Sequence, residues 1–201
     1  MSKRIGIFAG TFDPVHTGHV AFAVEAKKTA QLDQVYFLPE IQPRYKTGVT
    51  HIAHRIAMLN LALRPYSYLR VLEFPERQFS VASTLPRLNK HFKHDQLIFM
   101  MGSDTFSSLP DWALSGQLIK RAGAVVGIRG SHDLHNIIEI ANKLSSPLRE
   151  FHIIESHRAI ESSSRIRGLL SMGAETDDLL SVQRYVTQNW LYSSVLVTER
   201  L

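Results

Sequence analysis

The sequence of 201 residues contains no cysteine. Disulfide bonds, thiolate zinc sites and a cysteine nucleophile are therefore excluded. Any catalysis by this chain has to use His, Lys, Arg, Asp or Ser side chains, or a bound ion. The absence of cysteine thus narrows the chemistry before any motif is considered.

Long apolar runs are also missing. None approaches the roughly 18 residues that a membrane-spanning helix needs, and the stretch from Ile5 to Ala9 is too short for the core of a signal peptide. We therefore expect a cytosolic protein with no membrane partner. Low-complexity tracts and fixed-period repeats are absent as well, and 44% of the residues are hydrophobic, enough for one sizeable core. We expect a single globular domain over residues 1–201.

The basic residues form no cluster. Lys and Arg total 23 against 18 Asp and Glu, which gives a net charge of +5. This excess favours an anionic partner, although many soluble proteins are equally basic. No basic stripe alternates with aromatic residues, as it does in nucleic-acid grooves. We expect phosphate-bearing small molecules, and no nucleic acid, as partners.

What the sequence does contain is an alternation of strand and helix patterns. The apolar runs at 96–101 and 124–128 are typical of strands buried on both faces of a parallel sheet. We predict a doubly wound, Rossmann-like α/β fold with a parallel sheet and helices on both faces. The remaining predicted strands are 3–8, 34–38, 69–72 and 151–154, and the predicted helices are 18–30, 52–63, 81–92, 133–144, 163–171 and 182–190.

Three unusual segments follow predicted strands or open predicted helices. They are Ala9 to His19, Gly102 to Trp112 and Ser162 to Arg167. Ligands of open α/β sheets bind outside the carboxyl ends of the strands, where the strand order reverses. We therefore expect the three segments to form one site.

The first segment places His16 and His19 around Gly18, at the start of a predicted helix. A helix N-terminus presents unpaired N–H groups and partial positive charge, and Gly10 and Gly18 allow close approach of a polyphosphate. The two imidazoles can donate hydrogen bonds to phosphate oxygens and stabilise a nucleotidyl transfer that needs no covalent intermediate. Alternatively, one histidine caps the helix and the other lies on the surface.

The other two segments allow both a functional and a structural interpretation. Asp104 can accept hydrogen bonds from ribose hydroxyls and Trp112 can stack on a pyridine ring, or they are a helix cap and a core residue. Residues 162–167 place hydroxyls at a helix start and an arginine one turn inside it. That pattern suits either phosphate binding or a plain serine cap.

The string GTFDPVHTGH resembles the HxGH motif of the nucleotidylyltransferase superfamily, and the stretch is similar to its nicotinate mononucleotide adenylyltransferase branch. GSDTF followed by LPDW resembles the GxDxL and LxxW segment of that branch. SSSRIR looks like its SSTxIR motif, Arg129 matches an arginine in a VxxR context, and VQRYVTQNWLY resembles its closing helix. The resemblance therefore covers essentially the whole chain.

The resemblance implies transfer of AMP from ATP to nicotinate mononucleotide, with release of pyrophosphate, in NAD biosynthesis. It implies Mg²⁺ bound with ATP, and catalytic roles for His16 and His19. Acceptor binding is carried over to Thr84, Asp104 and Trp112. The ATP-binding positions it implies are Gly10, Thr11, Phe12, His16, Gly18, His19, Lys46, Arg129, Ser163, Ser164 and Arg167.

Two segments depart from the pattern of the branch. A PPHK segment reads Pro43 to Lys46 (PRYK), which keeps the lysine, and Val81 and Ala82 stand where a Tyr-Thr pair is usual. Loss of a hydroxyl beside the pyridine substituent weakens discrimination between acid and amide. Alternatives are therefore another acceptor, nicotinamide mononucleotide or phosphopantetheine, and a non-catalytic nucleotide-binding regulator. The two histidines disfavour the regulator, because a binder needs no transition-state stabilisation.

Further histidines repeat an HxxH spacing, which on a helix can place two metal ligands on one face. No carboxylate or third histidine is paired with them, so we expect solvated helix faces and no dedicated metal site. The pairs are His51 with His54, His91 with His94, and His132 with His135.

Overall fold

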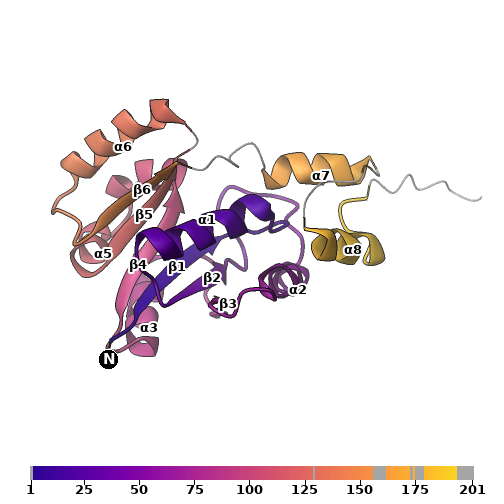
Figure 1. The fold of residues 1–201 in the computed structure, drawn as a ribbon, viewed down its shortest axis with the longest axis horizontal. Helices are drawn as coiled ribbons and strands as arrows, with labels where there is room; N and C mark the ends of the chain where they lie inside the picture. The colour runs from indigo at the N-terminus through magenta and orange to yellow at the C-terminus, as the bar shows by residue number, and fades with distance from the viewer. Residues whose placement is uncertain (1, 129, 156–161, 173, 175–178, 194–201) are drawn as a thin grey trace, which may run out of the picture.

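The computed structural model describes residues 2–128, 130–155, 162–172, 174 and 179–193. Within them, strands form one sheet of six in the order β3-β2-β1-β4-β5-β6 (Figure 1). All five pairings are parallel. The strands are β1 (Arg4–Gly10), β2 (Gln34–Pro39), β3 (Leu69–Val71), β4 (Gln96–Gly102), β5 (Gly123–Ile128) and β6 (Phe151–Glu155).

Alternating side chains of the strands enter two separate cores. In β1, Ile5 and Ile7 belong to one buried cluster and Phe8 to the other. In β4, Ile98 and Met100 belong to the same cluster as Phe8, whereas Phe99 between them belongs to the cluster of Ile5 and Ile7. Because both faces are buried, these strands are apolar throughout rather than at every second position.

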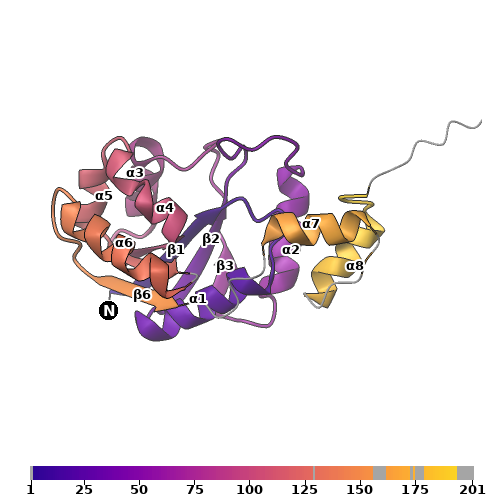
Figure 2. The same cartoon turned by 90° about the horizontal axis from the view of Figure 1, so that it is seen from above.

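Helices cover both faces of the sheet (Figures 1 and 2). On one face, α1 (Thr17–Thr29), α2 (Ile52–Leu63) and α8 (Leu180–Gln188) supply buried side chains, and Leu170 of α7 (Ser163–Ser171) packs against them. On the other face the helices are α3 (Val81–His91), α4 (Ser103–Ser107), α5 (Ser115–Arg121) and α6 (Ser131–Lys143). The predicted doubly wound α/β fold is confirmed.

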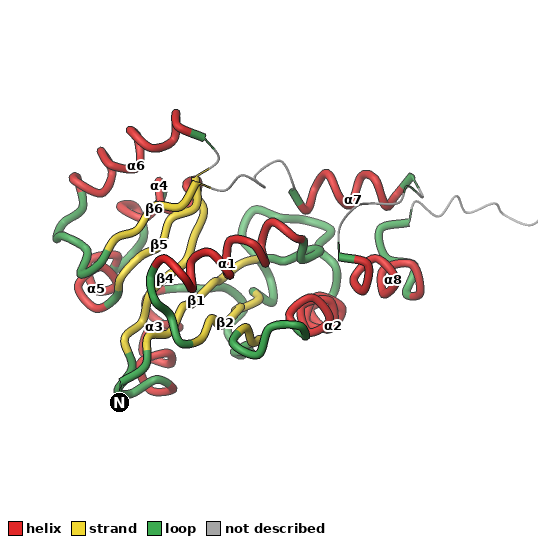
Figure 3. Tube along the Cα trace, in the orientation of Figure 1, coloured by secondary structure: helices red, strands yellow, loops and turns green. Residues whose placement is uncertain are grey.

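Every strand and helix predicted from the sequence is present, with ends displaced by no more than two residues (Figure 3). The sequence prediction missed α4, α5 and the 3₁₀ helix η1 (Leu109–Asp111). Helices of five and seven residues are too short to display a helical period in the sequence. Among the described residues, no helix combines the length and apolar character required to cross a membrane.

Candidate active site

A cavity of about 790 Å³ opens at the carboxyl ends of the central strands β1 and β4. It lies where the strand order reverses, because β1 leads to β2 on one side while β4 leads to β5 on the other. The loops that follow the two strands therefore diverge and leave a crevice between them. The first two of the three predicted segments line this cavity, and the third reaches it through Ser162.

His16 and His19 lie side by side in the wall of the cavity. Their ring centroids are 3.7 Å apart, and the planes are inclined by 36°. His16 is the N-cap residue of α1 and is only 7% exposed, and its backbone N–H donates to Nδ1 of His19 over 3.3 Å. His16 thus caps α1 and also lines the cavity, two roles that the sequence left as alternatives.

The environment of His19 lowers the pKa of its imidazole well below the ordinary value of 6.5. Desolvation is the largest cause, and the charges of His16 and Lys46 act in the same direction. Phe12 packs against the ring with a centroid distance of 5.1 Å. Because Nδ1 accepts the hydrogen bond from His16, Nε2 carries the proton of the neutral ring. His19 is therefore a neutral donor near pH 7.

Lys46 brings a positive charge to the same end of the cavity. Its Nζ donates to Oγ1 of Thr11 over 2.8 Å, which connects the loop after β2 to the loop after β1. Both residues line the cavity beside His19. A lysine, two imidazoles and a helix N-terminus are donors suited to a polyphosphate.

A buried arginine, Arg55, holds the loops of this end together. It is 0% exposed, and it donates to the carbonyl oxygens of Thr11 (2.7 Å), Ile41 (2.9 Å) and Thr50 (2.8 Å). Burial lowers the pKa of its guanidinium, while the nearby Asp13 carboxylate counteracts that shift. Sequence reasoning missed Arg55, because its three partners lie in two loops, after β1 and after β2, and no local pattern marks it.

Asp13 and the start of α7 hold the histidine loop from the other side. The Asp13 carboxylate accepts from Thr50 N (3.2 Å) and from the Tyr192 hydroxyl (2.6 Å), and its carbonyl accepts from Arg167 Nη1 (2.7 Å). Ser163 Oγ donates to the carbonyl of Pro14 over 2.9 Å. The α7 residues therefore stabilise the loop that carries His16.

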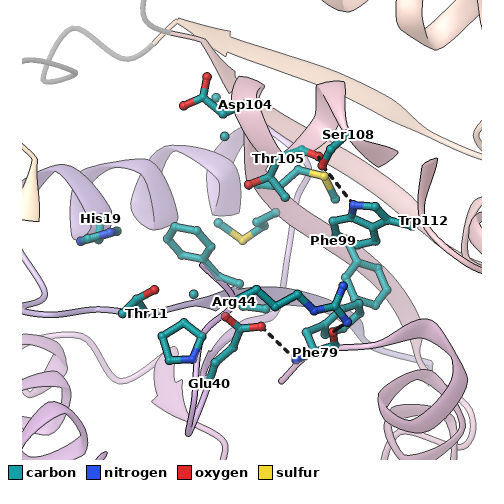
Figure 4. Close-up of a pocket in the computed structure, with 18 of the residues that line it drawn as sticks. Thr11, His19, Glu40, Arg44, Phe79, Phe99, Asp104, Thr105, Ser108 and Trp112 are labelled. Atoms are coloured by element: carbon teal, nitrogen blue, oxygen red, sulfur yellow. Dashed lines mark hydrogen bonds between the residues drawn. The ribbon is translucent and has the colours of Figure 1, made fainter. Parts of the chain in front are cut away.

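The opposite end of the cavity is aromatic (Figure 4). The rings of Phe79 and Trp112 are inclined by 50° with centroids 5.9 Å apart, and Phe79 also contacts Phe99. Trp112 Nε1 donates to Oγ of Ser108 over 3.0 Å, which fixes the indole. Asp104 lines the cavity and is exposed. This end offers flat apolar surfaces to a planar ring.

Several predicted site residues do not line the cavity. The Thr84 side chain is 2% exposed and accepts a hydrogen bond from Ser80 N, so it supports the first turn of α3 instead of facing an acceptor. Phe12 is buried behind His19. Ser163, Ser164 and Arg167 bond to one another or to the 13–14 loop. Arg129 lies outside the described residues.

The described histidines of the HxxH pairs have separate surroundings. Of the described histidines in them, His51 caps α2, His54 bonds to the Tyr185 hydroxyl (2.9 Å), and His135 lies 3.3 Å from Glu139. Across residues 2–128 and the later described ranges, no three His, Cys, Asp or Glu side chains form a group able to hold a metal ion.

The parallel strands in this order, with paired imidazoles where the order reverses, agree with a nucleotidyltransferase. The family model described as cytidylyltransferase-like matches residues 7–169. A solved structure with the same fold is the Plasmodium falciparum nicotinic acid mononucleotide adenylyltransferase complexed with NaAD, with a TM-score of 0.76. It is 16% identical, and the match covers 94% of this chain and 97% of that one, so it supports the fold alone.

Similar proteins of known name identify the family within the nucleotidyltransferases. A probable nicotinate-nucleotide adenylyltransferase of Dehalococcoides mccartyi is 30% identical over 96% of this chain and 98% of its own. The nicotinate-nucleotide adenylyltransferase of Bacillus subtilis is 32% identical over 96% of this chain and 100% of its own. The chain belongs to the family of nicotinate-nucleotide adenylyltransferases, which are enzymes.

Proposed function

We propose that this chain transfers AMP from ATP to nicotinate mononucleotide and releases pyrophosphate, as the names of its relatives imply. The observation that carries the proposal is the division of one cavity into a donor-rich end and an aromatic end. The first suits a triphosphate and the second a pyridine ring. A dinucleotide is the product expected from a cavity that holds both.

In the proposed reaction, a phosphate oxygen of the mononucleotide attacks the α-phosphorus of ATP. A P–O bond forms to the acceptor as the bond to pyrophosphate breaks, so no covalent enzyme intermediate is needed. His19 donates through Nε2–H to a phosphate oxygen, and Lys46 offsets the charge that develops on the leaving group. His16 contributes from the adjacent position. Positioning and charge stabilisation supply the catalysis.

Magnesium is proposed to enter with ATP. Magnesium usually keeps several water ligands and binds through substrate phosphates, so the proposal requires no cage of protein ligands. When bound, the ion neutralises charge on the triphosphate. The carboxylates that line the cavity, and that would hold its water ligands, are those of Glu40, Asp104 and Asp111. We propose a cytosolic location, as expected for an enzyme acting on soluble nucleotides.

Pyrophosphate release tests the proposal. Wild-type protein is given ATP and Mg²⁺ with nicotinate mononucleotide, nicotinamide mononucleotide or phosphopantetheine, and with no acceptor. Release with nicotinate mononucleotide, and little with phosphopantetheine, is expected. Release only with phosphopantetheine would favour the alternative acceptor that the apolar Val81 and Ala82 in the cavity wall allow. Tight ATP binding without release from any acceptor would favour a nucleotide-binding regulator.

A further inference from the structure

We propose that Arg44 binds the negatively charged pyridine substituent, and thereby selects the acid form of the mononucleotide over the amide form. The proposal rests on the proposed function and concerns the aromatic end of the same cavity. Arg44 lies in the loop between β2 and α2, two residues before Lys46. Its side chain extends away from Thr11 and His19 in Figure 4.

The guanidinium of Arg44 is fixed next to the aromatic residues. Nε donates to Oε1 of Gln78 over 2.7 Å, and Nη2 donates to the carbonyl of Phe79 over 3.3 Å. Phe79 in turn contacts Trp112. Figure 4 shows the Arg44 side chain crossing the cavity, with its guanidinium ending beside Phe79. A ring held against Trp112 therefore has this cation within reach of its substituent.

The wall at the start of α3 has a hydroxyl at Ser80, and its Oγ is paired with Oγ of Ser83 over 2.6 Å. Val81 and Ala82 line the cavity at the start of α3, and both side chains are apolar. A carboxylate and a carboxamide have similar size and differ in charge, so a neutral apolar wall discriminates poorly between them. A guanidinium presents paired donors that match the two oxygens of a carboxylate. Arg44 thus provides the discrimination that Val81 and Ala82 lack.

Glu40 and Asp111 are acidic residues that also line the cavity, and Asp111 directly precedes Trp112. Oε1 of Glu40 accepts from the backbone N–H of Phe79 over 2.9 Å. Arg44 and Glu40 therefore hold Phe79 by its carbonyl and its amide respectively. The bond to Phe79 occupies one oxygen of Glu40, whereas Nη1 of Arg44 donates to no group among the described residues. Nη1 of Arg44 is therefore a cationic donor left to meet a carboxylate ligand.

The test compares kcat/KM for nicotinate and nicotinamide mononucleotide in wild-type, Arg44→Gln, Arg44→Lys and Arg77→Gln proteins. Arg77 is exposed and lies outside the cavity, so Arg77→Gln is a matched control that removes one positive charge close to Arg44. We expect Arg44→Gln to lower the acid-to-amide ratio about 10-fold, mainly through KM for the acid. Arg44→Lys keeps part of the ratio, and Arg77→Gln keeps it within about 2-fold.

The ratio is measured within each variant, so a partly unfolded variant does not mimic the effect. An unchanged ratio in Arg44→Gln would overturn the inference and assign selection to backbone N–H groups at the start of α3. Equal falls in Arg44→Gln and Arg77→Gln would also overturn it, in favour of a general field effect. Wild-type protein that uses both acceptors equally would contradict selection by Arg44 but would leave the proposed function intact. Wild-type protein that uses neither contradicts the proposed function itself.

Discussion

Single side chains explain how the two histidines are held in the cavity wall. His16 fixes the tautomer of His19 by donating to its Nδ1, and Phe12 packs against the ring. The pair, Lys46 and Trp112 could be found from the sequence, because each stands in a motif next to a predicted strand. Arg55 could not be found, since a buried cation is recognised only when its distant carbonyl partners are known.

Replacing His16 by alanine is expected to lower kcat about 100-fold to 1000-fold, with a smaller change in KM for ATP. The reason is that a group that stabilises developing charge acts mainly in the transition state. Steady-state pyrophosphate release measures both constants. His94→Ala, which removes an exposed histidine outside the cavity, should behave as wild type. A change in KM alone would assign His16 to ground-state binding.

The lowered pKa of His19 predicts a pH dependence of folding stability. Between the low folded pKa and the unfolded value of 6.5, the unfolded chain binds the extra proton. The contribution of His19 is therefore fully present above pH 6.5 and is lost as the pH falls below it. Urea unfolding at pH 7.5 and pH 5 should show a smaller loss in His19→Gln than in wild type. Equal losses would contradict the prediction.

At the scale of elements, the close packing of β1 against its neighbours depends on glycine. A Cβ on Gly6 would lie 2.8 Å from Leu32 Cδ1 and 3.1 Å from Val35 Cγ2. We expect Gly6→Ala to lower the free energy of unfolding by about 1–3 kcal/mol through overpacking. Gly168→Ala in α7, where a Cβ meets nothing within 4 Å, should instead stabilise by up to roughly 1 kcal/mol. Urea unfolding measures both, and a stabilised Gly6→Ala would contradict this packing.

Elements also show where sequence reasoning succeeds. The strands and the longer helices were predicted because apolar runs and helical periods persist over enough residues to be recognised. The segment from Gly102 to Trp112 was predicted only as a motif, and the short helices α4 within it and α5 just after it were missed. Thr84 shows that the direction of a single side chain is also difficult to predict from the sequence. Its place in the sequence suggested a ligand contact, whereas the turn of α3 directs its hydroxyl to Ser80 N.

For the molecule as a whole, Tyr192 connects the end of the described chain to the loop before α1. Burial and the bond to Asp13 raise the pKa of its hydroxyl well above 10, so it remains a donor at neutral pH. Tyr192→Phe is expected to cost about 1–2 kcal/mol of unfolding free energy. The urea midpoint measures the cost, with Tyr66→Phe as the control because no hydrogen bond of that hydroxyl is found in the described ranges. An unchanged midpoint would show that the connection adds no stability.

The central place of β1 has a consequence for how the chain is made. As the polypeptide leaves the ribosome, β1 can pair with β2 at once, but its second edge remains open until residues 40–95 have followed and β4 emerges. During that interval the half-formed sheet presents unpaired backbone groups and an apolar surface, which other nascent chains or chaperones can contact. The strand that leads into the histidine loop is thus made before the other five strands of the described sheet, yet one of its edges stays open until β4 pairs with it.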